Sequence, residues 1–176
     1  DTAGGAVDLR AVYVTHCRVC AGEITVGSVH GNTKFSTNGK PVVIESGMDG
    51  EIEINTAGGE ADLQIGSSAK EVVITSEGGD VRLRLPSDLN ANVEAKGKRG
   101  VLVDDGLKDH LKYQDMTCQH AKGTVPAHSE PTSQARGYTP STAQINIDAG
   151  TGFVELRGKD WLASLGSKFQ KLRDLK

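Results

Sequence analysis

The sequence lacks the features that mark several common classes of protein. No apolar run approaches the 18 or more residues of a membrane-spanning helix. Aromatic residues make up only 4% of the 176 residues, and no G-x-S-x-G elbow, Walker loop or dinucleotide-binding G-x-G-x-x-G is present. The net charge is −3 and the 20 Lys and Arg residues are scattered, so the basic stripe of a nucleic-acid-binding protein is missing. We therefore expect no transmembrane segment, no nucleic-acid partner and no enzymatic activity.

Cysteine is scarce as well. Three residues, an odd number, do not make a disulfide scaffold, so the sequence favours a reducing, intracellular compartment. Cys17 and Cys20 form a C-x-x-C pair, and Cys118 and His120 lie far downstream. Three thiolates and one imidazole are a ligand set of structural zinc sites. On a strand, however, Cys17 and Cys20 have opposite parity and point to opposite faces. Ordinary thiols are therefore favoured, and no metal or other cofactor is assigned.

Glycine, in contrast, is abundant, with 22 residues, and it divides the middle of the chain into blocks of similar length. Residues 23–40, 41–59 and 60–79 form blocks of 18, 19 and 20 residues, and a fourth block begins at Asp80. Glycines at the ends of the blocks supply the positive φ angles that tight corners need. A self-similar period near 20 residues is the signature of a solenoid.

Within the blocks, apolar and polar residues alternate, as in residues 51–55, 60–65 and 80–85. Alternation with a period of two places one set of side chains on each face of a β-strand. We predict an all-β fold, a single-stranded right-handed parallel β-solenoid with about 18–20 residues per rung. A hairpin sandwich also fits short strands separated by turns. The solenoid is favoured because residues 22–86 contain only Phe35 as a large aromatic core residue.

Two segments lie outside this pattern. Residues 107–140 are polar and contain three prolines, which predicts an irregular insertion in a solenoid domain of residues 1–159. In residues 160–176, apolar residues recur at spacings of three and four, which predicts an amphipathic helix with Asp160 as its N-cap. We expect this helix to cap the solenoid, with docking on another protein as the alternative. The start at Asp1, not Met, favours a processed form or an excised domain, and no targeting segment is seen.

Few residues carry a chemical signature. Ser67 and Lys70 match S-x-x-K, but the partner motifs of a serine nucleophile are missing. His30 is predicted to be a turn residue, because no carboxylate partner is assigned to it. Carboxylates are expected to make the outer face of the middle rungs acidic, with Asp49 at a turn; they are Glu45, Glu51, Glu53, Glu60 and Asp62. Paired carboxylates can perform glycoside chemistry, but a solvated, solubilising face is favoured.

Residues 21–32 and 77–86 resemble an adhesin domain family of unknown function, whose members are β-solenoids found in bacteria and in some eukaryotic proteins. Residues 151–156, followed by Trp161, Ser164 and Leu165, are most similar to the eukaryotic family with sequence similarity 185, member A. The likeness covers residues 20–100 and 140–166. It implies a β-solenoid and, for the eukaryotic members, a mitochondrial location. It implies no catalytic residues.

The function expected from these observations is a non-catalytic β-solenoid that serves as a binding or scaffolding surface, with a protein as its partner. A regular stack without a convergent polar pocket lacks the usual mark of a chemical site, and extended solenoid faces suit flat recognition. The alternative is a polysaccharide-binding or polysaccharide-cleaving β-helix protein that uses the acidic outer face, with Glu51 and Glu53 as the residues to replace.

Overall fold

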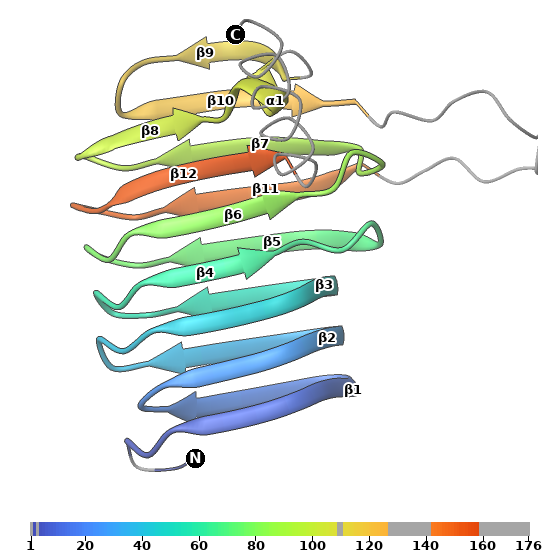
Figure 1. Ribbon diagram of the computed structural model, residues 1–176, viewed down its shortest axis with the longest axis vertical. Helices are drawn as coiled ribbons and strands as arrows, with labels where there is room; N and C mark the ends of the chain where they lie inside the picture. The colour runs from blue at the N-terminus through green and yellow to red at the C-terminus, as the bar shows by residue number, and fades with distance from the viewer. Residues whose placement is uncertain (1, 3, 109–110, 127–141, 159–176) are drawn as a thin grey trace, which may run out of the picture.

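The computed structural model describes residues 2, 4–108, 111–126 and 142–158, and it is all-β (Figure 1). One four-residue helix is present in this part of the chain, α1 (Asp105–Lys108). The predicted helix at residues 160–176 lies outside the described residues. No helix among the described residues is long and apolar enough to cross a membrane. The strands are β1 (Val7–Ala21), β2 (Ile24–Thr37), β3 (Val42–Asn55), β4 (Ala61–Gln64), β5 (Ala69–Thr75), β6 (Val81–Leu85), β7 (Ala91–Lys96), β8 (Gly100–Val103), β9 (Lys112–Met116), β10 (His120–Val125), β11 (Ala143–Asp148) and β12 (Phe153–Gly158).

The strands form a single 12-stranded sheet that curls over on itself. The curl arises at the long strands, because β3 pairs with β4 through its first half and with β5 through its second half. Wing A is the run β4, β6, β12 and β8, and wing B is the run β5, β11, β7, β10 and β9. The strands β1, β2 and β3 contribute one half to each wing. Figure 1 shows the two wings as two layers, one in front of the other, and within each layer the strands are stacked along the long axis of the molecule.

Neighbouring strands are parallel from β1 to β6, and the in-register partners lie at similar separations along the chain. Ile24 pairs with Val42, Val42 with Ala61, and Ala61 with Val81. Three side-chain pairs that touch across β2 and β3, among them Lys34 and Glu53, are 19 residues apart. Residues at equivalent positions of successive strands therefore form rows that run across the strands.

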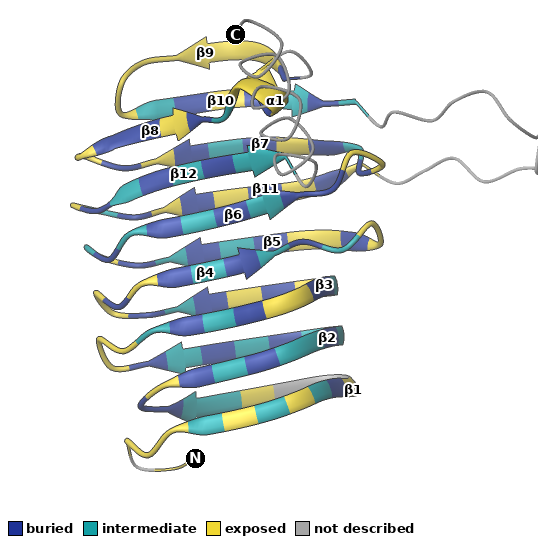
Figure 2. Ribbon diagram, in the orientation of Figure 1, coloured by how far each residue is buried: buried dark blue, intermediate teal, exposed yellow. Residues whose placement is uncertain are grey.

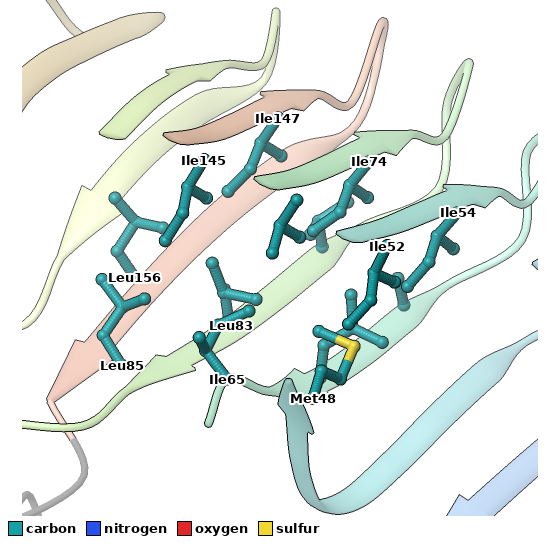
Figure 3. Packing of buried hydrophobic residues seen from close by; sticks show 14 of the residues in the cluster. Met48, Ile52, Ile54, Ile65, Ile74, Leu83, Leu85, Ile145, Ile147 and Leu156 are labelled. Carbon is teal, nitrogen blue, oxygen red and sulfur yellow. The ribbon is translucent and has the colours of Figure 1, made fainter. Parts of the chain in front are cut away.

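The core lies between the two wings and consists of the inward residues of each strand. Figure 2 shows the alternation of buried and outward residues, and β11 illustrates it with buried Ala143, Ile145 and Ile147 between exposed polar residues. Figure 3 shows side chains of the two wings meeting in this layer, among them Ile74 and Leu83. Burial of one such side chain contributes roughly 1.5–3 kcal/mol. The prediction of alternating strands is therefore confirmed.

A hydrogen-bonded corner recurs at the edge where wing A begins. The hydroxyl of the first residue of each corner donates to the carbonyl three residues later: Thr37 to Lys40, Thr56 to Gly59, and Ser76 to Gly79, at 2.6, 2.6 and 2.8 Å. Thr56 and Ser76 are fully buried. Their hydroxyls satisfy carbonyl groups that water cannot reach.

The order of strands in the sheet departs from chain order at β11 and β12. The strand β11 lies between β5 and β7, and β12 lies between β6 and β8, all of them parallel (Figure 1). The chain therefore leaves one strand position open on each wing as it passes from β5 to β8, between β5 and β7 on wing B and between β6 and β8 on wing A. Residues 143–158 fill both positions.

Residues 107–140 were expected to be irregular, and the structure differs in part of this segment. The strands β9 and β10 form an antiparallel hairpin, and β10 also pairs antiparallel with β7. The alternation of His120–Val125 is interrupted by Gly123, which weakened the sequence signal. Residues 127–141 lie outside the described part of the chain.

Candidate functional site

The four residues considered for zinc do not come together. Cys17 and Cys20 lie in β1, whereas Cys118 lies in the connection between β9 and β10, and His120 begins β10. β1 and the β9–β10 hairpin are at opposite ends of the molecule (Figure 1). Among the residues that the structure describes, no group of three or more His, Cys, Asp or Glu side chains is arranged to hold a metal ion.

The expected acidic outer face is divided between the two wings. Glu51 and Glu53 lie in the second half of β3, which belongs to wing B, whereas Glu60 and Asp62 lie at the start of wing A. Glu45 is exposed in the part of β3 between the two halves. The prediction of one acidic face was wrong. The alternation of apolar and polar residues shows which side chains face outward, but it does not show that β3 passes from one wing to the other.

The outer face of wing A is occupied by ion pairs. Arg84 lies 2.6 Å from Asp62, and Arg82 lies 3.5 Å from Glu60 and 3.8 Å from Glu155. Both arginines lie on β6, and they neutralise carboxylates on or beside the neighbouring strands β4 and β12. Exposed pairs of this kind contribute little stability each. We interpret this surface as a solvated face.

The outer face of wing B is hollowed across its width. One hollow, of about 650 Å³, is lined by residues of β1, β2, β3 and β5, from Arg18 to Val73. A second, of about 230 Å³, shares Val73 and extends to Glu94 and Asn146. A third, of about 250 Å³, shares Glu94 and Asn146 and extends to Gln114 of β9. The shared residues show that the three hollows lie next to one another along this face, and we call the three together the wing B groove.

One row of in-register residues runs along the floor of the wing B groove. Successive pairs in the strand ladders are Arg18 with Lys34, Lys34 with Glu53, Glu53 with Val73, Val73 with Asn146, Asn146 with Glu94, and Glu94 with Lys122. The groove therefore crosses the strands, and each strand contributes one outward side chain to this row.

The charges in the groove differ between its two ends. Near β2 and β3, Lys34 forms an ion pair with Glu53, and Asn32 donates a hydrogen bond of 3.0 Å to Glu51. Glu51 is in register with Glu71 on the neighbouring strand, and both are exposed. Two like charges on adjacent strands repel each other. This end of the groove is therefore the more negative.

Near β7 and β10, Glu94 lies 2.7 Å from Lys96 and 3.0 Å from Lys122. The hydrogen bond from Lys96, followed by that from Lys122, lowers the pKa of Glu94 from 4.5 to about 2. The same contact with Glu94 raises the pKa of Lys96. His120 adds an Nδ1 contact of 3.0 Å to Asp115. This end of the groove has charges of both signs that are already paired.

His30 has a carboxylate partner that the sequence reasoning missed. His30 lies in β2, not in a turn, and its Nδ1 is 3.1 Å from Oδ2 of Asp49 on β3. The ring of Tyr13 stacks on His30 with ring centroids 4.7 Å apart. His30 and Asp49 are 19 residues apart. This separation equals the length of the block of residues 41–59, and it is the feature of the sequence that could have predicted the pair.

The His30 pair does not form a catalytic triad. Asp49 lies between His30 and Ser68, and its Oδ1 accepts the Ser68 backbone N–H at 3.0 Å. A triad needs the imidazole between the hydroxyl and the carboxylate. Asp49 thus links β2 and β3 to the turn that precedes β5. Ser67 lies in this turn, and Lys70 lies in β5.

The wing B groove combines size, length and polar side chains, and it is the best candidate for a functional site. Among the described residues, no Ser, Cys or His lines its three hollows. The arrangement offers hydrogen-bonding and charged groups for recognition, without a nucleophile beside a general base. No family model, curated protein or solved structure matches the chain.

Proposed function

We propose that the chain is a non-catalytic β-solenoid binding module, and that the wing B groove binds an extended segment of a protein partner. Parallel pairing of β1 to β6 at separations of 16–20 residues, from Arg18 with Lys34 to Ala61 with Val81, supports the solenoid. The resemblance to the adhesin domain family of unknown function supports the same fold. The resemblance also adds a mitochondrial location to the proposal.

The length of the groove favours an extended ligand. Its row of residues crosses seven strands, from Arg18 on β1 to Lys122 on β10. With about 4.8 Å between strands, the row is roughly 29 Å long, which is the length of about nine residues of extended polypeptide. The row contains hydrogen-bonding groups, charges of both signs and the apolar Val73. Mixed side chains of this kind suit a polypeptide, whose side chains are equally mixed.

The chemistry of the groove favours binding over catalysis. Its most perturbed group, Glu94, has a pKa that is lowered to about 2 by two lysines. A carboxylate held ionised in this way is a poor general acid at neutral pH. Glu53 is likewise paired with Lys34. The single observation that carries the proposal is the line of three adjacent hollows, which share Val73, Asn146 and Glu94 as lining residues.

Photo-crosslinking from the groove tests the proposal. We would introduce p-benzoylphenylalanine in place of Val73, and in place of Val43 as the matched control. Val43 is also a half-buried, outward valine, but it pairs with Asp62 of wing A. We expect a discrete protein adduct from position 73 and none from position 43 in cells that express the full chain. Equal labelling from both positions, or none from position 73, would reject the groove as the binding surface.

A polysaccharide is the second candidate ligand, favoured by one observation. Glu51, Glu53 and Glu71 all line the hollow of about 650 Å³, and glycoside hydrolysis requires two neighbouring carboxyl groups. The purified protein would be incubated with a panel of neutral and anionic polysaccharides and assayed for new reducing ends. Turnover that is lost in Glu51→Gln and retained in the wing A variant Glu60→Gln would replace the protein-binding proposal with this one.

A further inference from the structure

The strands up to β8 follow one another at a regular separation of about 20 residues along the chain, but β11 and β12 are inserted between strands that this regular separation would make neighbours. In wing A, Ala61 of β4 pairs with Val81 of β6, 20 residues later, and Val101 of β8 follows after another 20 residues. In wing B, Ile52 pairs with Val72 of β5, and Val93 of β7 follows 21 residues after Val72. By this spacing β7 and β8 are the next neighbours of β5 and β6, yet β11 and β12 separate them.

The ladders show that direct pairing would keep every side chain on its present face. Val72 and Val93 are both partners of Ile145, and Ile74 and Ala95 are both partners of Ile147. In wing A, Val81 and Val101 share Val154 as partner, and Leu83 and Val103 share Leu156. All eight of these flanking residues point inward. Removal of β11 and β12 would therefore leave two strand pairs with matching register and matching parity.

We propose that residues 143–158 are an insertable unit, and that the chain has a second pairing state. In that state β7 pairs directly with β5 and β8 with β6, while residues 143–158 leave the sheet. The inserted state is favoured because it buries the inward residues of both strands, which are Ala143, Ile145, Ile147, Val154 and Leu156. The second state recovers the ladder hydrogen bonds of the flanking strands, which simple withdrawal of β11 and β12 would leave unpaired.

The second state would also alter the wing B groove. Asn146 lines two of its hollows and stands between Val73 and Glu94. With β11 withdrawn, Glu94 and its two lysines move one strand closer to Val73 and to Glu71. A ligand that contacts Asn146 binds only the inserted state and so stabilises it. The two-state inference itself follows from strand pairing and does not require such a ligand.

Cysteine trapping in the folded full chain distinguishes the two states. In a background with Cys17→Ser, Cys20→Ser and Cys118→Ser, we would combine Val73→Cys with Glu94→Cys. These positions are now two strands apart, about 9.6 Å, and a disulfide needs Cα atoms within roughly 4.4–6.8 Å. In the second state the two positions are direct partners. Oxidation in native buffer, followed by mass spectrometry, reports how fast the disulfide forms.

Two control pairs calibrate the measurement. Glu53→Cys with Val73→Cys lies on strands that are neighbours in both states and should oxidise rapidly. Val73→Cys with Lys122→Cys lies on strands that are neighbours in neither state, so this pair reports global unfolding. Its longer loop alone slows closure about fourfold relative to the pair at positions 73 and 94. We expect the 73–94 disulfide to form at least ten times faster than the 73–122 disulfide. A ratio of four or less would overturn the proposal.

Hydrogen exchange in the unmodified chain provides an independent readout. The proposal expects the amides of β11 and β12 to exchange together and at least tenfold faster than those of β3 and β4, which keep their partners in both states. Equal protection of all four strands would show that residues 143–158 open only with the whole molecule, and would also overturn the proposal.

Discussion

Gly79 packs against Gly59 with no room for a side chain between them. A Cβ atom added at Gly79 would lie 1.9 Å from the Gly59 carbonyl oxygen, and one added at Gly152 would lie 2.2 Å from the Gly79 carbonyl oxygen. The obstacle in both cases is backbone, which belongs to the adjacent corner and cannot turn away as a side chain would. The corners of neighbouring strands therefore stack directly on one another.

Gly79→Ala should consequently be strongly destabilising. We expect the free energy of unfolding to fall by about 3 kcal/mol or more, at the upper end of the effects of overpacking. Urea unfolding followed by circular dichroism measures the change. Gly106→Ala is the matched control, because Gly106 lies in α1 with only an ordinary contact of 3.5 Å. The control should be neutral or stabilising by about 0.5–1 kcal/mol, and a loss of stability similar to that of Gly79→Ala would contradict the stacking argument.

The buried hydroxyl of Ser76 should matter for a different reason. Its Oγ lies 2.8 Å from the Gly79 carbonyl oxygen and 3.0 Å from that of Gly59. Ser76→Ala leaves these carbonyls without that donor and should lower the free energy of unfolding by about 1–2 kcal/mol. An alanine fits at this place in a corner, because Ala149 is fully buried at the corresponding place in the corner that follows β11. Ser46→Ala, at an exposed position of β3, should change the melting temperature little, and an equal effect of the two substitutions would refute the role of the hydroxyl.

The Glu94 cluster predicts a pH-dependent contribution to stability. The pKa of Glu94 is lowered to about 2 in the folded protein from the ordinary value of 4.5. The ionised carboxylate therefore stabilises the fold above about pH 4.5, and this contribution is lost as the pH falls from 4.5 toward 2. Glu94→Gln should cost at most about 1 kcal/mol at pH 7, because the ion pairs are partly exposed.

Urea titrations of the wild-type protein and Glu94→Gln at pH 7, 4 and 2.5 measure this contribution. The stability difference should shrink steadily over that series and also shrink at pH 7 in high salt. A difference that is independent of both pH and salt would show that the effect of the substitution is one of packing.

Asp49 should stabilise the edge between the wings through its two acceptor contacts. Asp49→Ala removes the acceptor of the Ser68 N–H and the partner of His30. We expect a loss of about 1–3 kcal/mol and faster hydrogen exchange at Ser68. Asp88→Ala, a change at an exposed position of the β6–β7 connection, removes the same charge and should leave the exchange rate at Ser68 unaltered. Faster exchange at Ser68 in both variants would indicate a general effect of charge.

Several strands were predictable because they alternate strictly, as in Ala61–Gln64 and Val81–Leu85, where inward residues are apolar and outward residues are polar. The antiparallel hairpin of β9 and β10 could not be predicted in this way, because Lys112–Met116 is exposed along its whole length and does not alternate between buried and exposed residues. The position of Ala143–Asp148 between β5 and β7 could not be predicted from the sequence either. Its alternation fits many positions in a parallel sheet equally well, so register and neighbours depend on contacts distant in the chain.

The candidate site was predictable only in part. The alternation correctly placed Glu51 and Glu53 on an outer face, but the groove depends on residues from Arg18 to Gln114 that share no local pattern. The pair of His30 and Asp49 was accessible in principle through the 19-residue separation. It was missed because its two members lie in different blocks of the sequence, residues 23–40 and 41–59.

The position of β11 and β12 has a consequence for biosynthesis. A ribosome releases β5, β6, β7 and β8 before residues 143–158, although the latter occupy positions between them. The nascent chain therefore cannot reach its final arrangement by laying down each strand beside the one translated before it. Either the middle of the sheet waits unpaired until the last strands emerge, or an early pairing is broken to admit them.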